Sequence, residues 1–319
     1  MKIIREHPSD AAATKISLFD INELSRFDGP GLRCVLFFQG CRTNCEWCHS
    51  PHSQPKISPL LYNKNLCVGC GRCVEVCPNQ VHSFLEGEHI VNRKNCTHCA
   101  KCIEACPNSV DGVSGSALNL PTVEVSVDAL YGQIEPYLKL CKANNGGITL
   151  SGGEALLQLD GVNKLLTKCK ENGIHTAIET SGLLPLSVYR EVLDKVDLWL
   201  FGMRIITSKS GVKHRERIEA SLKLLLESGA KVLPRIPMVP SYFDRSDVMS
   251  CITSLIERYS IKEVCLSEWN RDYDHYYSQS GQTATMKPPS DDEIAECKKI
   301  ITNQIINLKC KLYENKNDR

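Results

Sequence analysis

The stretch Val35-Leu36-Phe37-Phe38-Gln39-Gly40-Cys41-Arg42-Thr43-Asn44-Cys45-Glu46-Trp47-Cys48 joins an apolar run to three closely spaced cysteines. Cys41, Cys45 and Cys48 follow the spacing Cys-x3-Cys-x2-Cys. Three thiolates can hold three irons of a four-iron, four-sulfur cube, which leaves the fourth iron open to a small molecule. In a chain with 18 cysteines among 319 residues, chance produces such a triad with odds of about 0.06. The triad alone therefore only suggests an iron–sulfur cluster. The neighbouring motifs decide between a cluster and chance.

Two near-identical cysteine runs follow the triad. They read Cys67-x2-Cys70-x2-Cys73-x3-Cys77-Pro78 and Cys96-x2-Cys99-x2-Cys102-x3-Cys106-Pro107. This is the pattern of bacterial ferredoxins, present twice. Structural zinc is the alternative, but zinc sites use Cys-x2-Cys pairs separated by a longer loop. His98, inside the second run, is expected to be a loop residue, although replacement of a cysteine ligand by His98 is the other possibility.

In the ferredoxin pattern, the fourth cysteine of each run serves the other cluster. We therefore assign Cys67, Cys70, Cys73 and Cys106 to one cube. The other cube takes Cys96, Cys99, Cys102 and Cys77. Crossed ligation ties the two half-repeats together, so we expect this insert to fold around its metal.

Composition narrows the class of protein. The net charge is +1 and the basic residues are spread along the chain, so no nucleic-acid partner is expected. The chain has neither a signal-type apolar stretch near Met1 nor an apolar run of about 20 residues, so we expect no membrane association and a cytoplasmic protein. Cysteines in that compartment favour thiolate ligands over disulfides. Seven further cysteines are isolated and are expected to fill the core: Cys34, Cys141, Cys169, Cys251, Cys265, Cys297 and Cys310.

Outside the insert, short β-rich runs alternate with amphipathic segments. Strands are predicted at 32–38, 147–150, 175–179, 197–201, 231–239 and 261–268, with a possible last strand at 308–313. Helices are predicted at 127–142, 155–172, 186–196, 213–228, 246–259 and 291–306. About six βα units predict an α/β fold, a partial (β/α)6 TIM-like barrel with an inserted bacterial-ferredoxin-like domain. The predicted division is 1–56 for the first part of the barrel, 57–115 for the insert and 116–319 for the second part.

The second predicted strand ends in Ser151-Gly152-Gly153-Glu154. Glycines at a strand end let a ligand approach the backbone closely, and Glu154 can accept from a cationic amine. An ordinary βα turn, with Glu154 in the first turn of the next helix, is the alternative. Because active sites of such folds lie at the carboxyl ends of the strands, this loop and the triad are expected at one rim.

Three stretches together resemble the signature of glycyl-radical-enzyme activating enzymes, a family of the radical S-adenosylmethionine superfamily. They are Phe27-Asp28-Gly29-Pro30-Gly31-x-Arg33, then Phe38-x-Gly40-Cys41-x3-Cys45-x-Trp47-Cys48-His49-x-Pro51, and Arg235-Ile236-Pro237-Met238-Val239-Pro240. The resemblance covers nearly the whole chain and includes family members that carry a two-cluster insert.

The resemblance implies that the chain cleaves S-adenosylmethionine reductively to methionine and a 5′-deoxyadenosyl radical. That radical removes a hydrogen atom from a glycine of a partner glycyl radical enzyme. The implied cofactors are three [4Fe-4S] clusters and S-adenosylmethionine, and the implied reductant is of flavodoxin or ferredoxin type. Cys41, Cys45 and Cys48 would hold the reacting cluster. The residues implied to contact S-adenosylmethionine are Trp47, Ser151, Gly152, Gly153, Glu154, Glu179, Ser181, Arg204 and Arg235.

The sequence departs from the family pattern on the substrate side. Gly202 and Arg204 stand where the family has an Asp-Leu-Lys run, and Asn270 stands near a usual His. Arg204 keeps a positive charge that can hold a carboxylate bidentately. Because of these departures, the alternative of a radical enzyme that acts directly on a small molecule or peptide stays open. A pure electron-transfer protein would explain the insert but not the triad with Gly152-Gly153-Glu154.

Overall fold

The computed structural model describes residues 13–109, 115–203, 212–239, 246–267, 273–287, 289–304 and 309–313. Within these ranges, none of the helices combines the length and apolar character that a bilayer-spanning segment requires.

A nine-stranded sheet forms the main body, in the order β13-β12-β11-β10-β9-β8-β2-β1-β7. Neighbours from β2 to β13 pair in parallel, whereas β1 pairs antiparallel with both β2 and β7. The described strands leave β13 and β7 as the two edges, so the barrel is partial, as predicted. The strand bounds are β1 Lys15–Ser25, β2 Arg33–Phe38, β7 Val123–Ser126, β8 Gly147–Gly152, β9 His175–Thr180, β10 Leu198–Gly202, β11 Val232–Pro237, β12 Glu263–Ser267 and β13 Lys309–Tyr313.

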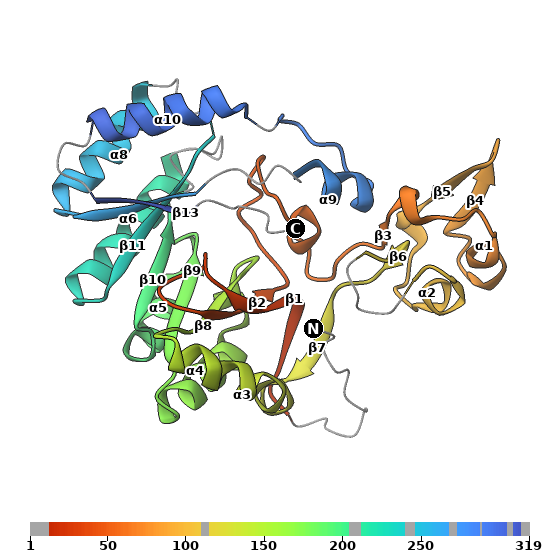
Figure 1. The fold of residues 1–319 in the computed structure, drawn as a ribbon, viewed down its shortest axis with the longest axis horizontal. Coiled ribbons are helices and arrows are strands. Elements are labelled where there is room, and N and C mark those ends of the chain that lie inside the picture. Colours follow the sequence, from red (N-terminus) through yellow and green to blue (C-terminus); the bar gives the residue numbers. More distant parts are fainter. Residues whose placement is uncertain are drawn as a thin grey trace.

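Helices cover the outer face of the sheet (Figure 1). Their bounds are α3 Val127–Ala143, α4 Leu159–Glu171, α5 Leu186–Val192, α6 Val212–Glu227, α8 Ser246–Arg258 and α10 Asp291–Gln304. Apolar side chains of these helices and of the strands form one large buried core. Ala177, Leu200, Leu233 and Cys265, from four consecutive strands, pack together separately from that core. Five of the seven isolated cysteines are buried as predicted, and nothing is described of the side chains of Cys297 and Cys310.

Four elements differ from the sequence prediction. Strands β1 and β7 were not expected, and they add an antiparallel ribbon next to β2. Ile16, Leu18 and Ile21 of β1 are buried against the core, and the alternation is interrupted by a bulge between Leu18 and Asp20. The helix predicted at 155–172 begins as a 3-10 turn at Ala155–Gln158. A further short helix, α9 (Tyr273–Ser280), was also not predicted.

The insert lies to one side of the sheet (Figure 1). Its two ends meet where β3 (Leu61–Tyr62) pairs antiparallel with β6 (Leu118–Asn119). Between them the chain forms α1 (Arg72–Val76), the hairpin of β4 (His82–Leu85) with β5 (Glu88–Val91), and α2 (Lys101–Ala105). Helices α1 and α2 pack on each other and begin within the first and second cysteine runs. The two half-repeats of the sequence are thus neighbours in space.

Candidate active site and cluster cavities

The loop that carries the cysteine triad is closed at its base. It leaves β2 after Phe38, and the Gln39 Nε2 donates to the carbonyl oxygens of His52 at 2.9 Å and Pro55 at 2.7 Å. The backbone N–H of Cys41 donates to the Gln54 carbonyl at 2.9 Å. These bonds hold the loop at the carboxyl end of β2, where the sequence analysis expected it.

The far part of the loop packs against α9. The N–H of Cys48 donates to the carbonyl of Cys45 at 3.2 Å, which makes a tight turn. Cys45 and Trp47 are buried with Val239 and Tyr277, and the Tyr277 hydroxyl donates to a backbone carbonyl of the same loop at 3.3 Å. Trp47 therefore fixes the triad loop against the α9 segment. The Cys41 Sγ lies at the opposite end of the loop, 3.5 Å from the Thr43 Oγ1.

Two glycines, Gly152 at the end of β8 and Gly153 after it, let that strand end lie against the start of the triad loop. The N–H of Gly153 donates to the Phe38 carbonyl at 2.8 Å, and the N–H of Glu154 donates to the Gly40 carbonyl at 2.8 Å. A Cβ at Gly153 would collide with the Gly40 carbonyl oxygen, and Gly152 has a φ of +100°. The sequence pattern predicts that these glycines let a ligand approach the backbone. The structure shows that they first allow two loops of the site to touch.

Five of the predicted cofactor-binding residues form hydrogen-bonded groups at the same rim. The buried Glu154 Oε2 accepts from the backbone N–H of Ser181 at 2.9 Å and from its hydroxyl at 2.6 Å. The Glu179 Oε2 accepts from the Ser151 hydroxyl at 2.7 Å and from the Arg235 Nη1 at 3.2 Å. The Glu179–Arg235 ion pair is largely shielded from solvent, with 14% and 15% of the side chains exposed. Carboxylates and donors thus converge from β8, β9 and β11, next to the triad loop.

One predicted contact cannot be placed: Arg204 lies outside the described residues, as does Asn270. Gly202 ends β10 and is buried.

The two cysteine runs line two cavities in the insert. A cavity of about 330 Å³ has Cys67, Cys70, Cys73 and Cys106 in its wall. A second cavity of about 310 Å³ is lined by the remaining four, Cys77, Cys96, Cys99 and Cys102. Each wall therefore takes three cysteines from one run and the fourth from the other. This donor set fits a four-iron cube, because four thiolates around one cavity match its four irons.

The third cysteine of each run, Cys73 or Cys102, is buried, and burial raises the pKa of both thiols. The pKa of Cys73 is raised to about 11 and that of Cys102 to about 12, and neighbouring cysteines add to the effect. Thiolates are the form that binds iron. Iron must therefore displace a proton at each of these positions when a cluster is loaded.

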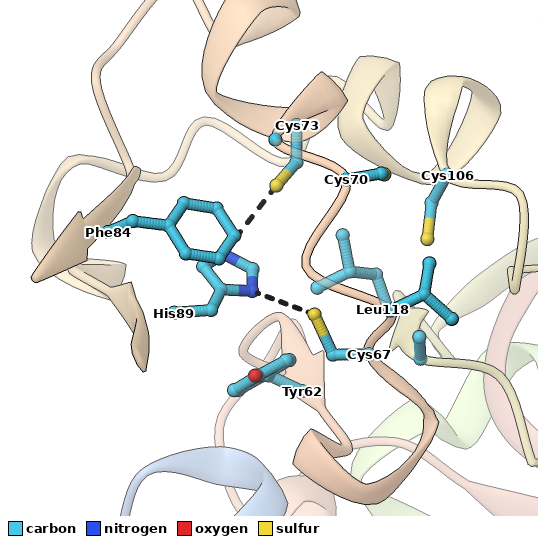
Figure 2. Close-up of a pocket in the computed structure, with 11 residues that line it drawn as sticks. Tyr62, Cys67, Cys70, Cys73, Phe84, His89, Cys106 and Leu118 are labelled. Carbon is cyan, nitrogen blue, oxygen red and sulfur yellow. Dashed lines mark hydrogen bonds between the residues drawn. The ribbon is translucent and has the colours of Figure 1, made fainter. Parts of the chain in front are cut away.

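Three side chains at the first cavity were missed by the sequence analysis. His89 lies 3.6 Å from the sulfurs of both Cys67 and Cys73 (Figure 2). Tyr62 meets the His89 ring edge-on, and Phe84 stacks on that ring. No spacing rule connects these residues with the cysteine runs, because β3 and the β4–β5 hairpin bring them to the cavity.

Known proteins with similar sequences provide evidence beyond this geometry. Residues 59–117 match a family model described as a 4Fe-4S dicluster domain. The chain is 35% identical over 259 residues to the choline trimethylamine-lyase activating enzyme of Oleidesulfovibrio alaskensis, covering 77% of this chain and 79% of that protein. It is 30% identical over 302 residues to the trans-4-hydroxy-L-proline dehydratase activating enzyme of Clostridioides difficile, covering 92% and 98%.

Two further similarities are weaker or shorter. The benzylsuccinate synthase activating enzyme of Thauera aromatica is 34% identical over 238 residues, covering 70% of each chain. A solved domain of the pyruvate-formate lyase-activating enzyme of Bacteroides vulgatus aligns with a TM-score of 0.41 at 21% identity, covering 52% of this chain and 98% of that one.

Proposed function

The chain belongs to the glycyl-radical-enzyme activating enzymes of the radical S-adenosylmethionine superfamily, and from this premise we propose that Cys41, Cys45 and Cys48 hold its S-adenosylmethionine-binding cluster. The observation that carries the proposal is the contact between two loops. The Gly153 and Glu154 N–H groups donate to Phe38 and Gly40 at the start of the triad loop. This contact places a buried carboxylate and a three-thiolate loop side by side.

The rim residues suit the polar groups of S-adenosylmethionine. The Glu154 carboxylate, oriented by Ser181, offers negative charge to the ammonium group of the methionine moiety. Glu179, held by Ser151 and Arg235, is placed to accept from ribose hydroxyls. Trp47 supplies an apolar ring from the triad loop for the adenine. Gly152 and Gly153 allow the backbone to approach the ligand, and Arg204 is proposed to hold the carboxylate.

The reacting cluster, when bound, supplies the electron that splits the sulfonium bond into methionine and a 5′-deoxyadenosyl radical. The protein's own part is to hold the nucleotide in one orientation and to exclude water. Packing of Cys45 and Trp47 against Tyr277 covers the triad loop on the α9 side. Such enclosure protects a reactive intermediate from side reactions.

We propose three [4Fe-4S] clusters for the chain. Two would lie in the insert, which the predicted division places at 57–115, with the eight cysteines distributed between the cavities as described above. With every iron ligated by protein, these two clusters would carry electrons, and a flavodoxin- or ferredoxin-type protein would supply them. A cytoplasmic location also stays a prediction.

The partner is a glycyl radical enzyme. The relatives named above activate a choline trimethylamine-lyase, a trans-4-hydroxy-L-proline dehydratase and a benzylsuccinate synthase. We propose that this chain installs the radical on an enzyme of that kind. The alternative, direct action on a small molecule, gains no support from these relatives.

The test is anaerobic incubation of the reduced, reconstituted chain with S-adenosylmethionine and each of these three enzymes. Electron paramagnetic resonance should detect a protein radical on at least one of them, and 5′-deoxyadenosine should form in equal amount. If 5′-deoxyadenosine accumulates while no protein radical is detected on any of the three enzymes, the chain acts on another partner or substrate. The matched control is each enzyme mixed with the chain in the absence of S-adenosylmethionine.

A further inference from the structure

Two buried histidines connect the two cluster cavities. His89, on β5, lies in the wall of the first cavity, and His82, on β4, lies in the wall of the second. The His82 Nδ1 and the His89 Nε2 are 3.0 Å apart, which is hydrogen-bond distance. Only 3% of His82 and 8% of His89 is exposed. Imidazoles so enclosed need a defined set of donors and acceptors.

The orientation of the His89 ring is fixed by its neighbours. Phe84 stacks on it with ring centroids 4.9 Å apart and an interplanar angle of 14°, and Tyr62 meets it edge-on at 4.6 Å. In this orientation the Nδ1 lies 3.6 Å from the Cys67 Sγ, and the Nε2 lies 3.6 Å from the Cys73 Sγ (Figure 2). Both ring nitrogens are thus aimed at sulfurs of the first cavity.

The hydrogen-bond pattern of the pair follows from the state of those sulfurs. Because the His82 Nδ1 and the His89 Nε2 lie at hydrogen-bond distance, one of these two nitrogens carries the N–H and the other accepts. A thiolate that ligates iron has no proton and can only accept. The N–H at the His89 Nδ1 therefore donates to the Cys67 sulfur. The His89 Nε2 then accepts from the N–H at the His82 Nδ1.

The opposite pair of tautomers is unfavourable, because it would direct a lone pair of the His89 Nδ1 at the Cys67 thiolate. The contacts therefore select one direction, from His82 to His89 to Cys67.

We propose that the His82–His89 pair donates a hydrogen bond to Cys67 and thereby raises the reduction potential of the cluster in the first cavity. One-electron reduction makes the cluster more negative, and a donor to its sulfur stabilises the more negative state. The electron enters alone and the proton stays on His89. This inference rests on the cluster ligation proposed above.

A single metal ion is the competing explanation. Ligand atoms of Cys73, His82 and His89 lie within 4.8 Å of one another and could hold one ion. Such an ion would take Cys73 away from the cube and leave one of its irons without a thiolate. The hydrogen-bonded arrangement keeps all four cysteines for the cluster, which is why we favour it.

The test uses the full chain, reconstituted anaerobically, in a Cys45→Ala background in which only the two insert clusters remain. Midpoint potentials are measured by redox titration followed by electron paramagnetic resonance, together with iron content. His89→Phe should shift the reduction equilibrium of one couple about tenfold toward the oxidised form, which is about 59 mV for one electron. His89→Asn, whose amide replaces the Nδ1–H donor, should restore most of the shift. Cys70→Ser alters a proposed ligand of the first cavity, so the couple that it changes is the couple of that cavity.

The matched control is His98→Asn, which alters an exposed histidine in the wall of the second cavity and should leave the first couple unchanged. If His89→Phe fails to load its cluster, His82→Phe carries the test and should shift the same couple by a smaller factor. Full iron content with no shift in any of these chains would overturn the hydrogen bond. Loss of iron in His89→Asn would establish His89 as a metal ligand instead. A parent chain without the two insert clusters would refute the ligation premise itself.

Discussion

Gly153 is the residue at which the two loops of the active site touch. A Cβ there would collide with the backbone oxygen of Gly40, which cannot turn aside as a side chain would. We expect Gly153→Ala to push the loops apart and cost about 1–3 kcal/mol of stability. Since displacement of about 1 Å can cost about a hundredfold in rate, cleavage of S-adenosylmethionine should fall by about that factor. The measurements are 5′-deoxyadenosine formation and thermal unfolding.

Gly132→Ala is the matched control for that substitution. Gly132 lies in the middle of α3, and a Cβ there meets nothing within 4 Å. The change should be neutral or stabilise the protein by about 0.5–1 kcal/mol, with unchanged cleavage. Equal behaviour of the two variants would mean that the loop contact does not position the site.

His52 makes the stability of the protein depend on pH. It is buried beside the triad loop between Phe19 and Tyr276, and burial lowers its pKa to about 4, with repulsion from His49 as a smaller cause. Its folded-state pKa is below the unfolded value of about 6.5, so its contribution is complete above pH 6.5 and is lost as the pH falls toward 4. The loss at pH 5 is about 2 kcal/mol.

His52→Phe keeps the ring contacts and removes the proton-binding site. Denaturant unfolding at pH 7.5 and pH 5 should therefore show a smaller loss for this variant than for the parent. Asp20 and His275 line the same cavity as His52. Both residues are present in the parent and in His52→Phe, so the two chains differ only at His52. An identical loss in both would show that His52 does not titrate in this interval.

At the scale of elements, the insert is fastened to the barrel through Arg93. Its guanidinium donates to the Leu60 carbonyl at 2.8 Å and to the Gln279 carbonyl of α9 at 2.7 Å. The same α9 packs on the triad loop, so one helix touches both the insert and the active site. Hydrogen bonds from a charged donor contribute about 1.5–3 kcal/mol each.

We expect Arg93→Ala to loosen this junction without removing any cluster. Hydrogen exchange should become faster in α9 and at β3, while the iron content stays that of the parent. Lys94→Ala is the control, because the exposed neighbouring side chain lies beside the junction without joining it. Unchanged exchange in Arg93→Ala would show that other contacts dock the insert.

At the scale of the whole molecule, the sequence predicted most elements because the βα alternation and the cysteine spacing are both local signals. The six main strands and their helices lie within a few residues of the predicted bounds. The crossed sharing of Cys77 and Cys106 between the cavities followed from a spacing rule, and the cavity walls agree with it.

What the sequence could not predict depends on contacts between distant segments. Strand β1 and helix α9 have no strong period of their own and are held by pairing and packing with remote elements. His82 and His89 reach the walls of the two cavities because the β4–β5 hairpin places them there. The role of Gly153 depends on a backbone oxygen 113 positions away, at Gly40.

The most direct test of the central claim is iron content measured together with cleavage of S-adenosylmethionine in Cys45→Ala and its parent. The parent should bind about twelve irons per chain and release 5′-deoxyadenosine under reducing conditions. Cys45→Ala should keep about eight irons, in the two insert clusters, and release none. A Cys45→Ala chain that still forms 5′-deoxyadenosine at the parent rate would contradict the assignment of the triad as the reacting site.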